Sequence, residues 1–451
     1  MRIVIIGAGK IGEAIVKHVS NEEHEVVIID NNPDVIEKMV NKYDVMGICG
    51  SGVSYEIQAN AGVEKSDLVI AVTASDERNM LACLVAKTMG VSRTIARVRD
   101  YNYTKQIHLM KDALGISLTI NPELESSNEI MRIINFPEAL KVDTFAKGNA
   151  DLIELYIPEG NPLVGQPLYS IASKYQVKAL VCAVCRGNEV FIPSGSFVLQ
   201  AKDKIHVTAS RDNARTLISK LGLSETKMKE ILIIGGGRIA MYLGAELLKN
   251  RYRVKIIERD LTRCEELSQV LKDATIIHGD GSDQNLLAEE GIVQSDVVVC
   301  ITGIDEENII ISMYANKLNV KKVITKVNKP SFAGLLESIE MASVISPQEI
   351  AASQIVRYIR ASENSRGNNI KTLYKLVNNQ VEAIEFSATK SSKVLNVSLK
   401  NMKIKPNMLI AGIVRDNEVI IPNGDSMILD GDSVIVVTTS HALNDLDEIL
   451  V

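Results

Sequence analysis

Runs of apolar residues alternate with stretches of helical spacing from residue 2 to about residue 120. The apolar runs predict strands at residues 2–6, 25–29 and 68–73, and the stretches of helical spacing predict helices at residues 12–20, 33–43 and 77–89. Strands that are apolar throughout are typical of a parallel sheet that helices cover on both faces. Pro122 then marks the start of another helix, residues 122–135, because proline is favoured at the first helical position. The pattern predicts an α/β domain with a doubly wound, Rossmann-like parallel sheet.

The pattern changes after residue 135 to shorter strands in which apolar and polar residues alternate. Residues 152–157 and 204–208 alternate in this way, and residues 168–175 have the spacing of a short helix. The turn signal Arg186-Gly187-Asn188 joins two further strands. We therefore expect a small α+β domain up to residue 222, followed by a polar linker at residues 223–230.

The second half of the chain repeats the first. Gly62-Val63 is repeated 229 residues later as Gly291-Ile292. Asn188-Glu189-Val190 is repeated at the same offset of 229 residues as Asn417-Glu418-Val419. Ser346-Pro347-Gln348-Glu349 begins the second copy of the long helix with the residues of a capping box. The repeat predicts two Rossmann-type nucleotide-binding domains, each followed by a small α+β domain. The expected domains are residues 1–135, 136–222, 229–363 and 364–451.

Composition narrows the choice of partners. The chain has a net charge of −6, with acidic and basic residues interspersed, and no Trp. Nucleic-acid-binding proteins usually present a basic face, so no nucleic-acid partner is expected. No apolar run approaches the roughly 20 residues of a membrane-spanning helix, and we expect a cytosolic protein. Cys182 and Cys185 have redox or metal spacing, but we expect them to be core residues of a strand.

The first half contains the dinucleotide-binding fingerprint in its usual context. The segment Gly7-Ala8-Gly9-Lys10-Ile11-Gly12 follows an apolar strand and opens a helix, and Asp30 closes the second strand. The glycines permit a tight turn, the approach of a pyrophosphate to the helix N-terminus and close packing of helix on strand. Asp30 is expected to bind the ribose hydroxyls, and its charge disfavours the 2′-phosphate of NADP. The alternative is that the glycines serve only the turn.

Further candidates lie where later strands end, because ligands bind at the carboxyl edge of open α/β sheets. Arg97 and Arg99 are two residues apart on a strand, so their guanidinium groups can converge on a phosphate. Alternatively, they belong to a solvated edge strand. Asp76 is expected either to contact the ligand or to cap its helix. The candidates are Gly50, Ser51, Thr73, Asp76, Asn79, Arg97 and Arg99.

The second half carries a related but altered set of site residues. Ala240 replaces the third glycine, and Glu258 replaces the ribose aspartate. Lys326 and Asn328 replace the two arginines, which removes a bidentate phosphate ligand. We expect this second site to bind more weakly or to prefer a different phosphate length, with Arg238 as a compensating cation. The candidates are Gly235, Gly237, Arg238, Ile239, Glu258, Asp280, Thr302 and Lys326.

The order of the domains and these motifs resemble the regulatory subunits of Trk potassium-uptake systems, whose modules are known as RCK or KTN domains. The resemblance covers essentially the whole chain and includes the fingerprint glycines, Asp30, the segment 73–79 and the arginines of Ala96-Arg97-Val98-Arg99. It implies that the nucleotide-binding domains take NAD(H), ATP or ADP and that the helix at residues 122–135 helps to pair them. It also implies a homotetrameric ring, peripheral on the inner face of the cell membrane, that gates an integral-membrane potassium transporter of the TrkH or TrkG kind.

An enzyme is the main alternative. An NAD-dependent oxidoreductase needs a proton-transfer group near the nicotinamide. The chain has six histidines, and none is matched between the repeats or placed next to an obvious partner: His18, His24, His108, His206, His278 and His441. His18 and His24 are expected on the polar outside of the first helix and its loop. We therefore expect a regulator without catalytic residues; a further alternative is a sensor of another potassium channel or an antiporter.

Overall fold

The computed structural model divides the chain into two compact units. Unit 1 consists of a first lobe, Met1–Met131, and a second lobe, Lys229–Val356, while unit 2 consists of Arg132–Met228 and Arg357–Val451. The structure describes residues 1–20, 24–136, 139–145, 150–187, 189–223, 228–329, 332, 336, 343–364, 370–376, 380–416, 418–439, 443 and 445–451. Residues 224–227 of the expected linker, His441 and the side chain of His108 lie outside this description. No helix of the described part is long and apolar enough to cross a membrane.

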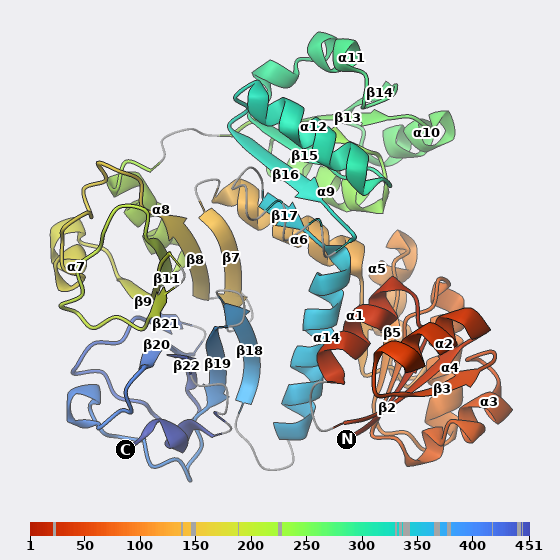
Figure 1. The fold of residues 1–451 in the computed structure, drawn as a ribbon, viewed down its shortest axis with the longest axis horizontal. Coiled ribbons are helices and arrows are strands. Elements are labelled where there is room, and N and C mark those ends of the chain that lie inside the picture. Colours follow the sequence, from red (N-terminus) through yellow and green to blue (C-terminus); the bar gives the residue numbers. More distant parts are fainter. Residues whose placement is uncertain are drawn as a thin grey trace. The chain divides into compact units, whose positions relative to one another are not determined.

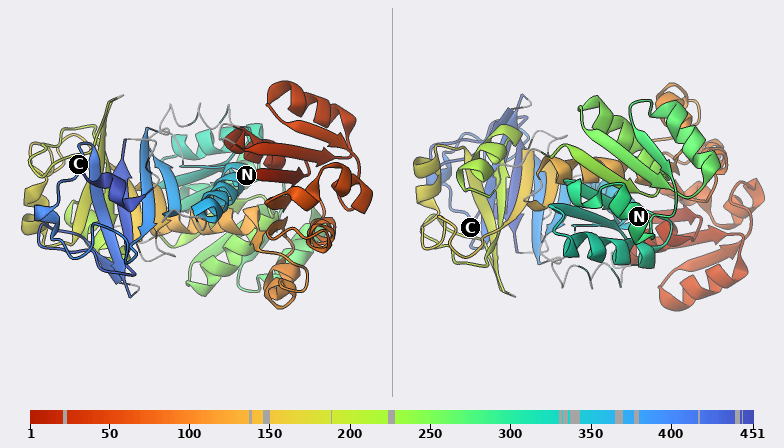
Figure 2. Two further views of the ribbon diagram at one scale, coloured as in Figure 1. Left: turned by 90° about the horizontal axis from the view of Figure 1, so that it is seen from below. Right: turned by 90° about the horizontal axis from the view of Figure 1, so that it is seen from above.

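The first lobe is built on a six-stranded parallel sheet with the order β3-β2-β1-β4-β5-β6. Its strands are β1 (Arg2–Ile6), β2 (Glu25–Asp30), β3 (Met46–Cys49), β4 (Leu68–Ala71), β5 (Thr94–Arg97) and β6 (Leu118–Ile120). Its helices are α1 (Lys10–Val19), α2 (Pro33–Lys42), α3 (Tyr55–Asn60), the short 3-10 helix η1 (Val63–Lys65), α4 (Asp76–Thr88), α5 (Tyr101–Met110) and α6 (Pro122–Asn135). Helices cover both faces of the sheet (Figure 1), and the turned views show the same layers (Figure 2). The prediction of a doubly wound α/β fold is confirmed.

The apolar composition of the strands explains why β1 lies at the centre of this sheet. Ile3, Val4 and Ile5 are fully buried, so the side chains on both faces of β1 are covered. The strand order reverses between β1 and β4, and such a switch point leaves a crevice at the carboxyl edge. β4 ends two residues earlier than the pattern predicts, because the Thr73 N–H turns to the side chain of Asn79 at 2.7 Å.

The second lobe repeats this sheet with the order β14-β13-β12-β15-β16-β17, again parallel. Its strands are β12 (Glu230–Ile234), β13 (Arg253–Glu258), β14 (Thr275–His278), β15 (Val297–Cys300), β16 (Lys322–Lys326) and β17 (Ser343–Ile345). Its helices are α9 (Arg238–Lys249), α10 (Leu261–Val270), α11 (Gln284–Glu289), the 3-10 helix η3 (Ile292–Gln294), α12 (Asp305–Lys317) and α14 (Pro347–Asn364). The boundaries between units 1 and 2 fall inside α6 and α14.

Unit 2 contains two antiparallel five-stranded sheets, one from each half of the chain, with the orders β10-β9-β11-β8-β7 and β18-β19-β22-β20-β21. The first small domain has β7 (Ala139–Phe145), β8 (Ala150–Tyr156), α7 (Tyr169–Tyr175), β9 (Ala179–Arg186), β10 (Glu189–Phe191), β11 (Lys204–Ala209) and α8 (Arg211–Lys220). The second has β18 (Ile370–Leu376), β19 (Val381–Ser387), the 3-10 helix η4 (Leu399–Asn401), β20 (Met408–Arg415), β21 (Glu418–Ile420), β22 (Ser433–Thr438) and the 3-10 helix η5 (Leu446–Ile449). The expectation of a small α+β domain after each parallel sheet is confirmed.

The two small domains share one hydrophobic cluster within unit 2. Its buried members come from both halves of the chain: Leu152, Cys182, Val381, Ala383, Ala411, Val414, Ile435 and Val437. Cys182 and Cys185 are free and buried, as expected of core residues, and burial raises the pKa of each thiol to about 12. A buried thiol of this kind is inert at neutral pH.

The two lobes of unit 1 are joined through Tyr242 of α9, which is 6% exposed. Its hydroxyl donates to the backbone carbonyl of Arg99 at 3.0 Å and accepts a hydrogen bond from the Asn121 amide at 2.9 Å. The ring lies 5.6 Å, between centroids, from that of Tyr101 at the start of α5. A side chain of the second lobe thus satisfies buried polar groups of the first.

A second contact between the lobes corrects one expectation. His18, in the last turn of α1, has its Nε2 2.8 Å from Oε2 of Glu349, in the first turn of α14. His18 was expected on the polar outside without a partner. Its partner follows 331 positions later in the chain, too far away for local sequence patterns to reveal.

We predict that Tyr242→Phe destabilises unit 1 without disturbing the fold of either lobe. The change leaves the Arg99 carbonyl without its donor, which costs about 1–3 kcal/mol for a buried group. Differential scanning calorimetry should show the unfolding temperature fall by roughly 2–4 °C per kcal/mol. Tyr103→Phe is the matched control, because that hydroxyl makes only an exposed hydrogen bond, 3.1 Å to Glu77. Equal unfolding temperatures for Tyr242→Phe and the control would contradict this role.

Candidate functional site

A cavity of about 750 Å³ lies at the carboxyl edge of the first lobe's sheet and extends to the second lobe. Its volume is within the range of roughly 300–1,000 Å³ that is usual for small-molecule and cofactor sites. The fingerprint loop, the end of β2, the loop after β3 and the loop after β4 form its wall in the first lobe. The cavity therefore lies where the topology of the sheet predicts a ligand.

The geometry of the first glycine loop follows from close contacts of its backbone. Gly7 has a φ of +101°, and a Cβ there would lie 2.9 Å from the Thr73 nitrogen. A Cβ on Gly12 would lie 2.1 Å from the carbonyl oxygen of Gly7, whereas a Cβ on Gly9 would meet no atom within 4 Å. Gly7 and Gly12 are thus required by the turn and by packing, while Gly9 faces open space through which a ligand can approach.

Asp30 holds the same loop in place from the end of β2. Its Oδ2 accepts a hydrogen bond from the Ala8 N–H at 2.8 Å, and its Oδ1 accepts one from the Asn32 N–H at 2.9 Å. Glu258 does the same for the second lobe, accepting from the Gly236 N–H at 2.6 Å. Asp30 also lines the cavity.

Two buried polar side chains brace the loops after β4 and β5. Asn79, fully buried, accepts from the Thr73 N–H at 2.7 Å and donates to the Arg97 carbonyl at 2.9 Å. Asp76 accepts from the backbone N–H groups of Arg99 and Asp100, at 2.7 and 2.8 Å. The cap of α4 is Ser75 and not Asp76, because the Ser75 hydroxyl accepts from the Arg78 N–H. Asn79 and Asp76 therefore shape the edge of the cavity without lining it.

The second lobe repeats these braces. The Thr302 N–H donates to Asn308 at 2.8 Å, and Asn308 donates to the Lys326 carbonyl at 3.0 Å. Asp305 accepts from the N–H groups of Asn328 and Lys329, at 2.8 and 2.9 Å. The same residue types thus close the same turns in both lobes.

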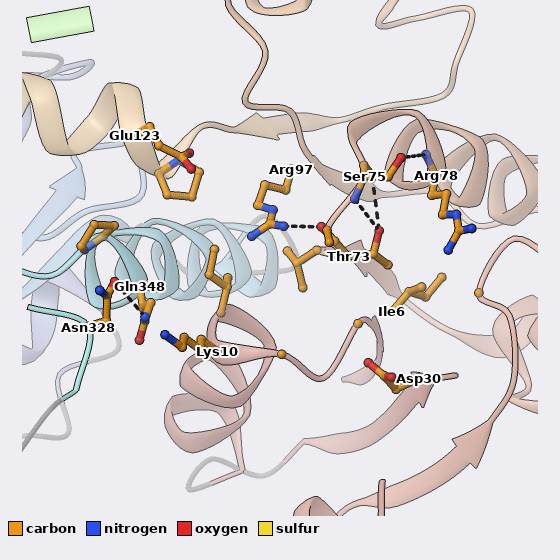
Figure 3. A pocket seen from close by; sticks show the side chains of 18 of the residues that line it. Ile6, Lys10, Asp30, Thr73, Ser75, Arg78, Arg97, Glu123, Asn328 and Gln348 are labelled. Carbon is orange, nitrogen blue, oxygen red and sulfur yellow. Dashed lines mark hydrogen bonds between the residues drawn. The ribbon is translucent and has the colours of Figure 1, made fainter. Parts of the chain in front are cut away.

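Arg97 and Arg99, predicted as a pair, point to different places. Arg97 lines the cavity, and its guanidinium donates to the Thr73 carbonyl, as Figure 3 shows. Its Nε is buried and finds no hydrogen-bond partner among the described residues. Arg99 instead bonds the Ala74 carbonyl and lies 3.4 Å from Asp76, outside the lining.

Burial and the neighbouring charge of Arg99 lower the pKa of Arg97 to about 10. Binding of an anion to a buried cation with an unused donor is favourable, because the anion accepts the unused hydrogen bond and offsets the cost of desolvating the cation. Glu123, at the start of α6, also lines the cavity, and its Oε2 likewise lacks a partner among the described residues. Polar groups of the wall are therefore available to a ligand.

The second lobe completes the wall with the start of α9, the end of β16 and the start of α14. Its lining residues are Gly237, Arg238, Ile239, Ile301, Lys326, Asn328, Pro347 and Gln348. Asn328 and Gln348 lie beside Lys10 of the first lobe in Figure 3, and the Gln348 amide donates to Asn328 at 3.3 Å. Burial lowers the pKa of Lys326, and the charge of Lys10 adds to this effect.

The wall carries more positive than negative side chains. Its cations are Lys10, Arg78, Arg97, Arg238 and Lys326, against the carboxylates of Asp30 and Glu123. α1 and α9 both begin at the cavity, with Lys10 and Arg238 as their first residues, so the N-terminal ends of two helix dipoles contribute positive potential. Such a site suits a ligand with several phosphate charges.

Some of the site residues predicted from the sequence line the cavity, and the others lie outside its lining. Those that line the cavity are Gly7, Gly9, Lys10, Ile11, Asp30, Gly50, Ser51, Thr73, Arg97, Gly237, Arg238, Ile239 and Lys326. Those outside the lining are Ala8, Gly12, Asp76, Asn79, Arg99, Gly235, Glu258, Asp280 and Thr302. For both groups of residues, contact with a ligand stays a prediction.

Sequence reasoning missed several lining residues, among them Asn31, Arg78, Glu123, Pro347 and Gln348. Arg78 and Glu123 had a local signal, because each lies in the first turn of a helix that starts at the carboxyl edge of the sheet. Gln348 had none, since it reaches the cavity only through the pairing of the lobes. No group of three or more His, Cys, Asp or Glu residues in the described part of the chain is placed to hold a metal ion.

Comparison with known proteins agrees with the duplicated architecture. The TrkA-N domain family matches residues 3–122 and 231–347, and the TrkA-C domain family matches residues 152–222 and 383–451. The Trk system potassium uptake protein TrkA of Halomonas elongata is 33% identical over 455 residues, covering 100% of this chain and 98% of that protein. The Trk system potassium uptake protein TrkA homolog 1 of Methanosarcina mazei is 32% identical over 456 residues, covering 99% of each. The solved structure of the GsuK channel bound to NAD shares the fold, with a TM-score of 0.64 at 17% identity, covering 97% of this chain and 77% of that one.

We predict that Arg97→Ala weakens ATP binding at least as much as Arg99→Ala. The sequence pattern alone predicts a loss of about tenfold for Arg99→Ala, since a charged hydrogen bond is worth roughly 1.5–3 kcal/mol. Arg97 lines the cavity, whereas Arg99 lies outside the lining and its guanidinium bonds the carbonyl of Ala74. Isothermal titration calorimetry measures both variants, with Lys65→Ala, an exposed lysine in η1 at the opposite edge, as the control. Wild-type affinity in Arg97→Ala would remove Arg97 from the site.

Proposed function

The chain belongs to the TrkA family of Trk-system potassium-uptake proteins, and we propose that it is a cytosolic, nucleotide-sensing regulatory subunit that gates an integral-membrane potassium transporter of the TrkH or TrkG kind. The observation that carries this proposal is the cationic cavity that both lobes of one chain line. A ligand bound there touches both lobes, so its binding depends on how they are arranged. This dependence is what a regulatory subunit needs, because a ligand shifts an equilibrium only by its differential affinity for the two states.

Adenine nucleotides are the ligands that fit the wall best. Asp30 and the loop at Gly50 and Ser51 suit an adenosine, and the start of α1 suits the first phosphates. A longer phosphate chain extends towards Arg238 and Lys326 of the second lobe. We propose ATP and ADP as competing ligands whose different lengths favour different lobe arrangements, and NAD(H) as the alternative, supported by the NAD-bound GsuK channel with the same fold.

The helices that leave unit 1 offer a route from the cavity to the rest of the protein. Pro347 and Gln348, at the start of α14, line the cavity, and Glu123 does so at the start of α6. Both helices continue without a break across the boundary of unit 1. A change in the position of their first turns is therefore passed on to the residues that follow in the chain.

An oxidoreductase finds less support. Histidine, tyrosine and cysteine, which often transfer protons in active sites, do not appear among the residues that line the described cavity. The cations of its wall are better explained by anion binding, and Asp30 by the hydroxyls of a ribose. We propose that nucleotides are bound here without being turned over to a substrate, and that four chains form the regulatory ring.

Reconstitution tests the proposal directly. Purified chain is added to proteoliposomes that contain a Trk-type transporter, and potassium flux is measured with ATP, ADP, NADH or no nucleotide. We expect flux that requires the chain and differs between ATP and ADP, and light scattering of the same preparation should give the mass of four chains. Arg97→Ala should lose the response to nucleotide, while Lys65→Ala should retain it.

Two results would overturn the proposal. One is flux that is indifferent to the chain in every nucleotide condition. The other is steady oxidation of NADH with a carbonyl substrate at an enzyme-like rate, roughly 1 per second or faster. A monomer in all conditions would defeat the ring without touching the nucleotide site.

A further inference from the structure

His18 and Glu349 form a charged contact between the lobes that the proposed function does not use. The His18 Nε2 lies 2.8 Å from Glu349 Oε2, and both side chains are about one-third exposed, at 32% and 34%. The pair joins the last turn of α1 to the first turn of α14. Each helix begins at the cavity, α1 with Lys10 and α14 with Pro347 and Gln348. The contact thus joins the last turn of α1, whose first residue lines the cavity, to the first turn of α14, whose first two residues line it.

The position of each residue in its helix favours the charged form of both. A cation is stabilised near a helix C-terminus and an anion near a helix N-terminus, and His18 and Glu349 occupy these positions. The hydrogen bond with His18 holds the pKa of Glu349 below its usual value of 4.5, against the opposing effect of burial. Glu349 is therefore ionised throughout the range in which histidine titrates, between pH about 5 and 8. Within that range, the charge of His18 decides the strength of the contact.

Two other charged side chains of α1, Lys17 and Glu13, belong to the surroundings of the pair in the described part of the chain. The Nζ of Lys17 lies 3.9 Å from the other carboxylate oxygen of Glu349. Glu13, also on α1, is paired with Lys42 at 2.7 Å and Lys38 at 3.6 Å, both from α2, and these contacts lower its pKa. Of the side chains named at this contact, histidine is the type that ordinarily changes its charge between pH about 5 and 8.

We propose that His18 and Glu349 are a positioning pair that couples nucleotide binding to pH: protonated His18 clamps α14 to α1, and the clamped lobes bind nucleotide more tightly. This rests on the proposed function only in taking the cavity as a nucleotide site. A nucleotide that contacts both lobes favours their paired arrangement, and so does the charged contact, so each strengthens the other. Affinity for nucleotide is therefore higher when the His18 imidazole is protonated than when it is neutral.

The test measures ATP affinity by calorimetry at pH about 6 and about 8, in the full chain and its variants. Solvent-exposed ion pairs contribute up to about 1 kcal/mol, so wild type should bind roughly two- to fivefold more tightly at the lower pH than His18→Gln does. His18→Gln should be as weak at both values as wild type is at the higher pH, once the protonation of ATP itself is subtracted. His18→Lys, a cation that does not titrate here, should restore tight binding at both values. His278→Gln is the control, because that exposed histidine contacts a backbone carbonyl at 3.1 Å within the second lobe.

Each outcome separates this proposal from the proposed function. Glu349→Gln should remove the pH dependence as His18→Gln does, while leaving the chain folded and able to bind ATP. Identical pH profiles in wild type, His18→Gln and His278→Gln would overturn the clamp while leaving the nucleotide site intact. Absence of ATP binding in every variant, including wild type, would instead contradict the proposed function. Weak binding by His18→Lys at both values would show that the pair acts through shape and not through charge, and would also overturn the proposal.

Discussion

The first-turn N–H groups of helices, which have no hydrogen-bond partner within the helix, are concentrated at one edge of each parallel sheet. The first turn of a helix leaves its N–H groups without intrahelical partners, and in this fold α1 and α9 start at the carboxyl edges of their sheets. The pairing of the lobes brings the starts of α1 and α9 to one cavity. Positive potential accumulates there from two helix dipoles and from lysine and arginine side chains. This arrangement favours an anionic ligand.

The remaining features of unit 1 keep that edge in shape. Acidic side chains hold the glycine loops, with Asp30 and Glu258 in equivalent roles. Buried amides, Asn79 and Asn308, tie the loop after one strand to the end of the next. Both lobes have these braces, but the cations that they contribute to the cavity wall differ, so that Lys326 stands where the first lobe has Arg97. The two lobes thus share one scaffold and differ in the chemistry that they present to a ligand.

Local sequence patterns predict the fold of each domain but not how the domains pair. The apolar run of β1 and the glycines of the fingerprint predict a parallel sheet and its ligand-binding edge, since burial and turn geometry are set within a few residues. Tyr242 and Glu349 gave no such signal, because their partners lie in the other lobe and periodicity says only that a face is covered. The shared core of unit 2 was missed for the same reason.

The candidate site shows a different limit of sequence reasoning. Asp76 was predicted either to contact the ligand or to cap its helix, and Asn79 to contact the ligand; in the structure both side chains brace the loops at the edge of the cavity. Aspartate and asparagine serve both purposes with the same donor and acceptor groups, so residue type at a strand end cannot separate them. The spacing of Arg97 and Arg99 would place them on one face of a strand, but β5 ends at Arg97. Arg99 follows the strand, and its side chain bonds the Ala74 carbonyl outside the cavity lining. The domain boundaries and the contacts with a ligand stay predictions.

The central claim is that one nucleotide contacts both lobes of the chain in a single cavity. Hydrogen exchange with mass spectrometry tests it most directly, because the first-turn amides of α1 and α9 have no intrahelical partner, so a ligand that accepts their hydrogen bonds slows their exchange. With ATP at saturation, the account predicts slowed exchange at the start of α1, around Lys10 and Ile11, and also at the start of α9, around Arg238 and Ile239. Protection confined to the first lobe, with α9 unchanged, would contradict it.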